Sequence, residues 1–177
     1  TLSLDVQNNK IKDIFTRVLK GHIAVASFKL NKNSYGDKID QSARKFLRDI
    51  NLDYPHGTGH GVGYFLNVHE GPQAISRGNK VKFKEGMITS NEPGYYKKNH
   101  FGIRIENLVY VKKTKSKLKF EDLTLVPIDK TLIEKKLLTS FEKNWLNRYH
   151  QKVFVRLKKF MNKLELTQLK QACSNIQ

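Results

Sequence analysis

The segment of residues 54–63 constrains the fold most strongly, because it holds four glycines and two histidines within ten residues. Glycine at this density suits a tight loop, since it lets the backbone turn sharply and approach other groups closely. Helical patterns precede the segment, with apolar residues at helical spacing over residues 9–27 and again from Ile39 to Ile50. Gly36-Asp37 between them indicates a turn and an N-cap. We therefore expect two helices followed by a loop.

Strand patterns follow the glycine-rich segment. Residues 62–69 alternate, and this predicts a strand with one apolar face made of Val62, Tyr64, Leu66 and Val68. Residues 86–91 form a short apolar run that ends at Pro93-Gly94. Residues 102–112 and 119–128 predict two longer strands.

Helix-spaced residues return after about residue 130. They are Leu132, Leu137, Phe141, Trp145, Leu146, Tyr149, Val153, Val155, Leu157, Phe160 and Leu164. Helices, then strands, then helices predict an α+β fold. A boundary near Asp129 would divide the chain into a domain of residues 1–129 and a helical extension of residues 130–177.

Composition narrows the classes of partner. Lys and Arg number 33 against 16 Asp and Glu, which gives a net charge of +17 and raises nucleic-acid binding as one interpretation. We favour a solvated surface and expect no nucleic-acid partner, because the basic residues are spread out and no zinc-finger spacing, RNA-binding signature or P-loop is present. No apolar run of about 18 residues occurs, so no membrane partner is expected. The single cysteine, Cys173, excludes an intrachain disulfide and favours a cytoplasmic location.

Three histidines, His56, His60 and His69, lie within fourteen residues among glycines. Imidazole binds divalent metals and moves protons near neutral pH. His56 and His60 are four residues apart, but the surrounding glycines argue against a helical zinc pair. The same histidines would also suit simple turn positions.

Two carboxylates follow at strand positions. Glu92 precedes Pro93, where a strand ends, and Glu106 lies in the middle of the predicted strand 102–112. The two-residue period places Arg104 and Glu106 on one strand face, so Arg104 is the expected partner of Glu106. One histidine and two glutamates could bind Mn, Co or Zn, whereas the Arg104–Glu106 pair could equally be a structural ion pair.

Four motifs in order resemble one family. They are His56-Gly-Thr-Gly-His60-Gly-Val-Gly, Asn67-Val-His69-Glu70-Gly-Pro72, Asn91-Glu92-Pro93-Gly94-Tyr95-Tyr96 and Gly102-Ile103-Arg104-Ile105-Glu106-Asn107. Together with Leu19–Ala24 and Trp145–His150, they are similar to the eukaryotic, cytosolic type of Xaa-Pro aminopeptidase (aminopeptidase P). The resemblance implies the C-terminal portion of a pita-bread (creatinase/aminopeptidase) fold with a helical C-terminal extension. It also implies removal of the N-terminal residue from peptides with proline in second place.

The resemblance assigns roles to individual residues. His60 and Glu92 would ligate one of two divalent ions, usually manganese, with cobalt or zinc as alternatives, and Glu106 would bridge both ions. Glu92 would also take a proton from the bridging water. His56 and His69 would hold the proline-containing peptide and stabilise the tetrahedral intermediate, and Arg104 would orient Glu106 or its neighbours. The extension after residue 130 would contribute to a homodimer.

The chain departs from the family pattern at its start. Two aspartate ligands and a further catalytic histidine would lie upstream, and Asp5, the only acidic residue in the first twelve positions, does not lie in the aspartate motif. We therefore expect a segment of a longer protein that ligates at most one ion well and is inactive alone. Alternative interpretations are a prolidase, a methionine aminopeptidase-like enzyme, or a non-catalytic pita-bread module that binds peptides.

Overall fold

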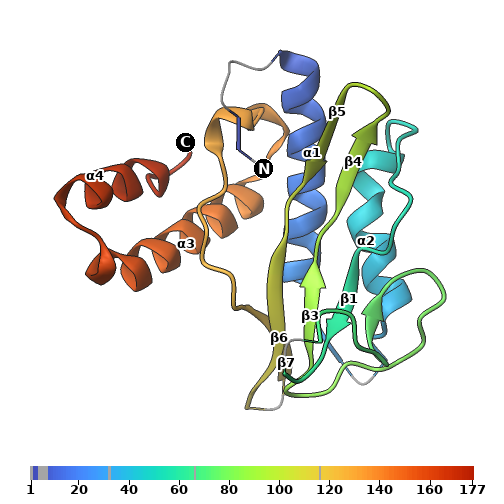
Figure 1. Cartoon of the computed structure of the whole chain (residues 1–177). Coiled ribbons are helices and arrows are strands. Elements are labelled where there is room, and N and C mark those ends of the chain that lie inside the picture. Colours follow the sequence, from blue (N-terminus) through green and yellow to red (C-terminus); the bar gives the residue numbers. More distant parts are fainter. Residues whose placement is uncertain (1, 4–7, 32, 66, 116) are drawn as a thin grey trace. The chain divides into compact units, whose positions relative to one another are not determined.

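The computed structural model describes residues 2–3, 8–31, 33–65, 67–115 and 117–177, so Asp5 and Leu66 lie outside the described residues. The chain forms two compact units. One comprises Arg17–Thr124, and the other comprises Thr1–Thr16 together with Leu125–Gln177. Figure 1 shows helices and strands in one chain, as the predicted α+β class requires.

The unit of residues 17–124 is built on an antiparallel sheet (Figure 1). Its strand order is β2-β1-β3-β6-β7. The strands are β1 (Gly59–Val62), β2 (Ala74–Ile75), β3 (Ile88–Asn91), β6 (Asn107–Thr114) and β7 (Lys117–Asp122). A separate two-stranded ribbon consists of β4 (Gly94–Lys97) and β5 (Phe101–Arg104).

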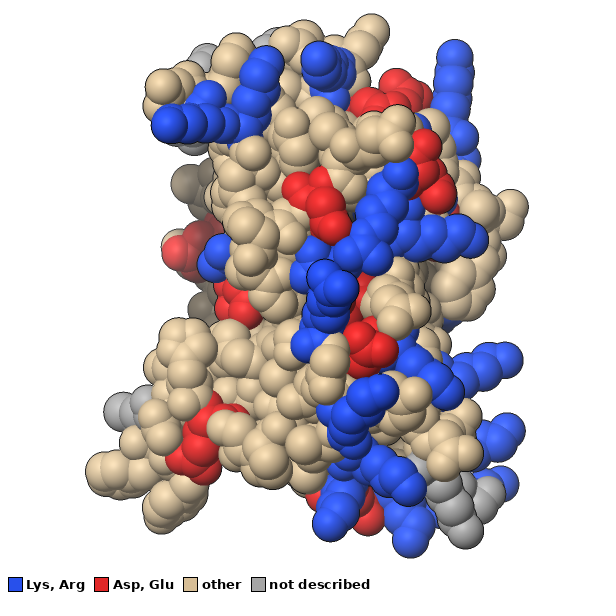
Figure 2. Space-filling model, turned by 90° about the vertical axis from the view of Figure 1, so that its right-hand side faces the viewer, with Lys and Arg blue, Asp and Glu red and all other residues tan. Residues whose placement is uncertain are grey.

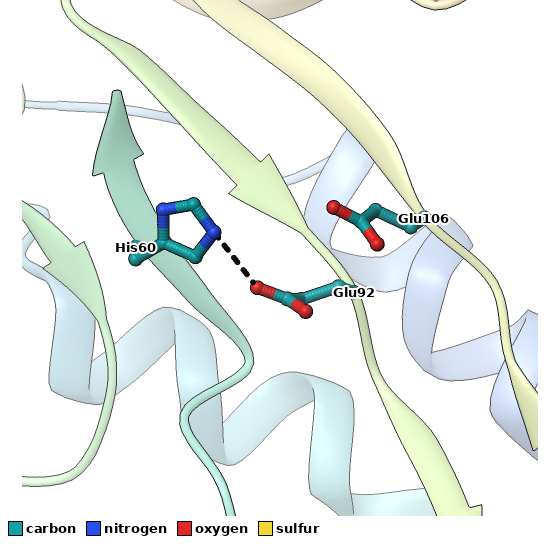
Figure 3. Close-up of side chains that lie close together, drawn as sticks. All are labelled: His60, Glu92 and Glu106. Carbon is teal, nitrogen blue, oxygen red and sulfur yellow. Dashed lines mark ion pairs between the residues drawn. The ribbon is translucent and has the colours of Figure 1, made fainter. Parts of the chain in front are cut away.

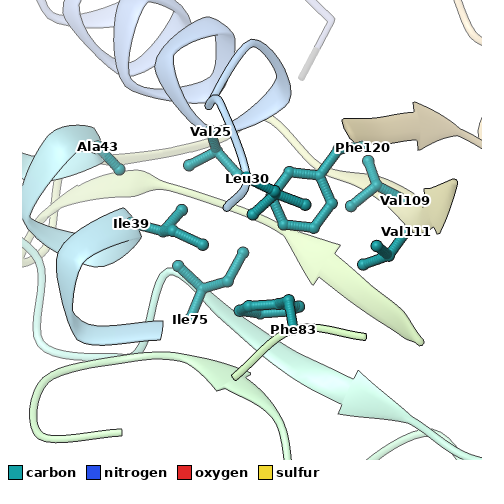
Figure 4. Packing of buried hydrophobic residues seen from close by; sticks show 9 residues of the cluster. All are labelled: Val25, Leu30, Ile39, Ala43, Ile75, Phe83, Val109, Val111 and Phe120. Carbon is teal, nitrogen blue, oxygen red and sulfur yellow. The ribbon is translucent and has the colours of Figure 1, made fainter. Parts of the chain in front are cut away.

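Helices α1 (Asn9–Ala26) and α2 (Gly36–Arg48) confirm the two helices expected before the glycine-rich segment. Their apolar faces meet the sheet in one core, shown in Figure 4, to which α1 contributes Val25 and α2 contributes Ile39 and Ala43. The sheet and its flanking segments contribute Leu30, Ile75, Phe83, Val109, Val111 and Phe120. Burial of each large apolar side chain stabilises the fold by about 1.5–3 kcal/mol. This core packs against the sheet and holds its inner strands β1, β3 and β6 in place.

The predicted cap of α2 is wrong. Tyr35 occupies the N-cap without a side-chain hydrogen bond, and Gly36 and Asp37 already belong to the helix. A Cβ on Gly36 would lie 1.7 Å from the carbonyl oxygen of Ala74, so close approach of the backbones explains this glycine. The Asp37 carboxylate accepts a hydrogen bond from the Gly78 amide instead of capping the helix.

The predicted strand 62–69 is also wrong. After β1 ends at Val62, the chain folds back, because the Gly63 amide donates to the Asn67 carbonyl and the Glu70 amide donates to the Gly61 carbonyl. Tyr64, Phe65 and Val68 are exposed rather than aligned on a buried face. Leu66, the fourth member of the predicted face, lies outside the described residues.

Part of the predicted loop 54–63 is in fact strand β1, and its glycines allow close contact with neighbouring strands. A Cβ on Gly59 would lie 2.0 Å from the Ser90 carbonyl oxygen, and a Cβ on Gly61 would lie 2.0 Å from the Glu70 carbonyl oxygen. Both distances are too short for any real contact. The glycines therefore serve strand packing here, and His60 between them lies on a strand.

We predict that Gly59→Ala lowers the free energy of unfolding by about 1–3 kcal/mol, because the added methyl group must displace β1 from β3. Urea denaturation would measure the change. Gly71→Ala is the matched control, because a Cβ on Gly71 would meet no atom within 4 Å. Equal stability of the two variants would contradict this account of the close approach.

The predicted strand 102–112 is two strands. β5 ends at Arg104 and pairs with β4, whereas β6 begins at Asn107 and pairs with β3 and β7. Burial still alternates through the break, since Ile103, Ile105 and Val109 are buried. Glu106 thus lies at a junction between two sheets and is exposed, rather than in mid-strand among apolar residues. The strand predicted at 119–128 is β7, which ends at Asp122.

Lysines lie on the outer edge of the five-stranded sheet. Lys117 and Lys119 belong to β7, the edge strand, and Lys119 pairs with Glu121 at 3.0 Å. Lysine on an edge strand discourages pairing with another chain. Figure 2 shows Lys and Arg side chains gathered mainly over the centre and right of the visible face, with Asp and Glu among them. The interpretation of a solvated surface without a nucleic-acid partner stays a prediction.

In the second unit, helices α3 (Ser140–Leu157) and α4 (Lys163–Ala172) confirm the helical pattern after residue 130. Short 3₁₀ turns accompany them: η1 (Lys130–Leu132), η2 (Lys135–Leu137) and η3 (Lys158–Phe160). Capping boxes begin both helices, Thr139 with Glu142 and Asn162 with Glu165. The division into residues 1–129 and 130–177 stays a prediction.

Not every residue in the helix-spaced set packs inside. Leu146, Tyr149 and Val153 are buried as expected. Phe141, Val155, Phe160 and Leu164 are exposed, although they share the helical spacing of the buried residues. Among the described residues, no helix combines the length and apolar character needed to cross a membrane.

Candidate metal centre

Strand β1 and the ends of its neighbours β3 and β6 bring His60, Glu92 and Glu106 together (Figure 3). The pairing of Asn91 with Asn107 places Glu92, one residue after β3, beside Glu106, one residue before β6. His60 lies on β1, the other neighbour of β3. One ligand atom from each of the three side chains lies within 4.8 Å of the others. The fold therefore brings together three side chains that can bind a metal ion, each from a different sequence motif.

The His60 ring presents a free lone pair to this cluster. Its Nδ1 lies 3.0 Å from the Gly61 carbonyl oxygen, which can only accept a hydrogen bond, so Nδ1 carries the proton in the neutral ring. The Nε2 lone pair then faces Glu92 Oε1 at 3.3 Å. Two electron-rich atoms at this distance need a proton or a cation between them. The donor set of one imidazole and two carboxylates fits a divalent metal ion.

Glu92 is a buried carboxylate whose two oxygens have different partners. Oε1 accepts a hydrogen bond from the Ser90 hydroxyl at 2.8 Å, and Oε2 forms an ion pair with Arg104 Nη1 at 3.3 Å. The Ser90 hydroxyl also accepts from the His60 amide at 2.8 Å. Ser90 thus orients both a histidine and a glutamate of the cluster. The sequence alone gives no sign of this role for Ser90, because it depends on the β1–β3 register.

Arg104 forms an ion pair with Glu92, in which Nη1 lies 3.3 Å from Oε2. Its expected role of orienting Glu106 or its neighbours stays a prediction. Partial burial lowers the pKa of Arg104, but the hydrogen bond with Tyr96 and the charges of Tyr96, Glu92 and Glu106 outweigh burial and raise the pKa overall. The guanidinium therefore stays charged, and Glu106 lies near enough to contribute to that charge state.

Tyr96 connects Arg104 to His56. The His56 Nδ1 lies 2.7 Å from the Gly57 carbonyl oxygen, so in the neutral ring Nδ1 carries the proton and Nε2 accepts. The Tyr96 hydroxyl, 2.9 Å from His56 Nε2, donates to it and accepts from Arg104 Nε at 2.7 Å. A directed chain of hydrogen bonds runs from Arg104 through Tyr96 to His56.

Tyr96 belongs to the motif Asn91–Tyr96, but the sequence alone indicated no role for it. A signal existed in two glycines, because the β4–β5 register places Tyr96 opposite Gly102. A Cβ on Gly94 would lie 2.7 Å from the Tyr96 hydroxyl oxygen, and a Cβ on Gly102 would lie 3.1 Å from the Tyr96 ring. Both glycines leave space for the tyrosine ring.

His69 lies beside the cluster without joining it. Its ring centroid is 4.2 Å from that of His60, and its side chain is exposed. The structure thus places all of the predicted site residues around one region: His56, His60, His69, Glu92, Arg104 and Glu106. Their individual roles stay predictions.

Comparison with known proteins agrees with this arrangement. The model of metallopeptidase family M24 matches residues 1–113, and the model of the C-terminal region of the same family matches residues 116–176. A probable Xaa-Pro aminopeptidase P of Coprinopsis cinerea is 49% identical over 154 residues, which cover 81% of this chain and 25% of the relative. Aminopeptidase P2 of Arabidopsis thaliana is 47% identical over 156 residues, covering 82% of this chain and 22% of the relative.

Solved structures show the same fold. X-prolyl aminopeptidase of Caenorhabditis elegans, described as a cytosolic enzyme with a di-nuclear active site, superposes with a TM-score of 0.88 and 40% identity, over 96% of this chain and 29% of that one. The prolidase of Pyrococcus furiosus superposes with a TM-score of 0.63 and 28% identity, over 71% of this chain and 35% of that one. The pita-bread prediction is confirmed. The chain spans about a quarter of the length of the curated relatives.

Proposed function

Because the chain belongs to metallopeptidase family M24, we propose that it carries part of the active site of an Xaa-Pro aminopeptidase. The substrate would be a peptide with proline in second place, and the reaction would release the N-terminal residue by hydrolysis. The observation that carries the proposal is the convergence of ligand atoms from His60, Glu92 and Glu106 within 4.8 Å. The names of the Coprinopsis and Arabidopsis relatives support the substrate class.

We propose two divalent ions for the intact protein, with manganese preferred over cobalt or zinc. His60 Nε2 and Glu92 would hold one ion, and Glu106 would be shared by both. The bound ions would lower the pKa of a bridging water and polarise the scissile carbonyl group. The described residues offer this one cluster of three metal-binding side chains, so the described part of the chain would supply good ligation for at most one ion.

The chain's own residues would orient and move the proton. The Ser90 hydroxyl and the Arg104 guanidinium hold the two oxygens of Glu92 in fixed directions. Held in this way, Glu92 would accept the proton of the attacking water. Arg104 would thus position Glu92 through a direct ion pair and would affect Glu106 less directly.

His56 and His69 would bind the peptide. The His56 ring is fixed by the Gly57 carbonyl and the Tyr96 hydroxyl, so it cannot turn freely while a substrate binds. His69 lies against the His60 ring and is exposed to an incoming ligand. We further propose that the intact protein forms a homodimer. We also propose a cytoplasmic location, which the description of the Caenorhabditis enzyme as cytosolic supports.

Hydrolysis by the intact protein tests this function. We would incubate it with Mn²⁺ and an Xaa-Pro-Pro peptide, beside a matched Xaa-Ala-Pro peptide and an Xaa-Pro dipeptide. Release of Xaa from the Xaa-Pro-Pro peptide alone is the expected result. Cleavage of the dipeptide alone would identify a prolidase, and release of Xaa from the alanine peptide would refute proline specificity.

We predict that Tyr96→Phe lowers kcat of the intact protein by about 10–100-fold, because the variant loses a hydrogen bond with a charged donor and releases His56. Affinity for Mn²⁺ should change by less than about twofold, since Tyr96 lies outside the three-residue cluster. Tyr95→Phe is the matched control, because the Tyr95 ring packs against Phe101 with centroids 6.0 Å apart. Equal kcat values for the two variants would contradict the prediction.

A further inference from the structure

A buried arginine on α2 has contacts that reach the candidate site. Arg44 is 7% exposed, and its guanidinium stacks over the Tyr54 ring at 4.0 Å. Nε donates to Asp40 Oδ2 at 2.8 Å, and Nη1 donates both to Asp53 Oδ1 at 2.7 Å and to the Tyr54 carbonyl at 2.8 Å. Nη2 donates to the His56 carbonyl oxygen. One side chain therefore ties α2 to the segment that carries His56.

The same helix holds the far end of this segment through Asp40. Asp40 Oδ1 accepts from the Thr58 hydroxyl at 2.6 Å and from the Thr58 amide at 3.3 Å. The Thr58 hydroxyl also bonds the Tyr54 hydroxyl. The Thr58 carbonyl in turn accepts from the Glu92 amide at 2.8 Å. Segment 53–58 is thus fixed on both sides of His56, and its end contacts the backbone of a candidate metal ligand.

The Arg44 guanidinium keeps its charge in this network. Burial lowers the pKa of Arg44, but hydrogen bonds with Asp40 and Asp53 and the charges of Tyr54 and Asp40 raise it overall. A buried guanidinium has a desolvation cost, which two carboxylates and two backbone carbonyls offset here. Lysine could not replace it, because an ammonium group lacks the planar fork that bonds several acceptors at fixed angles.

We propose that Arg44 is a positioning residue for the peptidase site, acting through the backbone of His56. Its guanidinium fixes the His56 carbonyl, so the His56 ring meets the Tyr96 hydroxyl and, through it, Arg104 and Glu92. The inference rests on the proposed function for its catalytic consequence. A displacement of about 1 Å in a site of this kind can cost 100-fold in rate.

The kinetic test compares Arg44→Lys with Arg48→Lys in the intact protein. Arg48 lies one turn further along α2 and is half exposed. Its Nε donates a hydrogen bond to Asp53 Oδ2 at 2.9 Å. We expect Arg44→Lys to lower kcat by about 10–100-fold with Mn²⁺ affinity unchanged, and Arg48→Lys to leave kcat within about twofold. An unchanged kcat in Arg44→Lys would overturn the proposal.

A double-mutant cycle separates positioning from general stability. If Arg44 acts through His56, then Arg44→Lys should lower kcat by less than about twofold in a His56→Ala background. The same fold-loss in both backgrounds would overturn the proposal, because it would show a general structural effect. If Arg44→Lys fails to fold, Asp53→Asn replaces it in the cycle. This variant weakens the bond between Arg44 Nη1 and the partly exposed Asp53 side chain, and it keeps the guanidinium.

The ring tautomer of His56 tests the positioning without any substrate. Long-range ¹H–¹⁵N spectra of histidine-labelled protein should show a single Nδ1–H tautomer in wild type and in Arg48→Lys, and mixed tautomers in Arg44→Lys. A single tautomer in Arg44→Lys would overturn the proposal. If wild type cleaves no Xaa-Pro peptide, the proposed function fails, whereas these spectra still decide the role of Arg44.

Discussion

Glu92→Gln is expected to lower kcat of the intact protein towards an Xaa-Pro peptide by about 10²–10⁴-fold. An amide cannot accept the proton of the attacking water, and it no longer offers an anion to Arg104, whose Nη1 lies 3.3 Å from Oε2. The amide also disturbs the acceptor that faces the Ser90 hydroxyl. This carboxylate combines more functions than any other side chain in the proposed mechanism, so its loss should have the largest effect on rate.

Steady-state kinetics with metal content measured on each sample would check this result. Glu121→Gln is the control, because Glu121 pairs with Lys119 on the β6–β7 hairpin and has no part in the proposed mechanism. Glu121→Gln should retain full activity. A Glu92→Gln protein that keeps more than about a tenth of wild-type kcat would show that another group takes the proton.

Stability is expected to fall as the pH decreases from about 6.5 to 4. Burial lowers the pKa of His22 to about 4, although backbone hydrogen bonds with Ile105 and Asn91 raise it. Burial and the charge of Lys130 lower the pKa of His150 to about 4 as well, against a hydrogen bond with Ile128. Both groups bind protons more readily in the unfolded chain. Their stabilisation is therefore complete above pH 6.5 and is lost as the pH falls towards 4.

The expected loss is about 3.5 kcal/mol for each histidine once the pH is well below 4, because the pKa falls from 6.5 to about 4 on folding. Urea unfolding at a series of pH values would measure it, with His150→Gln as the test variant. Glutamine can still accept from the Ile128 amide, which lies 3.0 Å from His150 Nε2. The variant should show a shallower slope between pH 6.5 and 4 and a constant offset above pH 7. Parallel curves over the whole range would contradict the prediction.

Apolar periodicity predicted the parts of the fold that depend on burial of one face. The helix over residues 9–27 is α1, and the alternation of Ile103, Ile105 and Val109 survives in the structure. Periodicity could not show that the alternating run crosses from one sheet to another at Glu106. That break depends on which strand each half pairs with, and strand partners are not encoded in the period.

The loop after β1 could not be separated from a strand for a related reason. Tyr64 and Val68 alternate as strand residues do, but backbone bonds between Gly63 and Asn67 and between Glu70 and Gly61 turn the chain back. The glycines at 59 and 61 had the opposite effect on the prediction. They indicated a loop, whereas they permit close packing of a strand against its neighbours.

The candidate site divides in the same way. His60, Glu92 and Glu106 could be named because metal-binding residue types stand in motifs that resemble a known family. Ser90, Tyr96 and Arg44 could not, because their value lies in register and in contacts from other elements. Arg44 had one local signal, its spacing of four residues from Asp40 on a helix, but such a spacing is usually only a surface ion pair.

Calorimetric titration of the 177-residue chain with Mn²⁺ tests the central claim most directly, with His60→Ala as the ligand variant and His100→Ala as the control on the exposed turn between β4 and β5. We predict that one ion binds per chain, and that binding is lost in His60→Ala and kept in His100→Ala, because His60, Glu92 and Glu106 form one cluster. Binding that survives His60→Ala unchanged, or no binding to the wild-type chain, would contradict it.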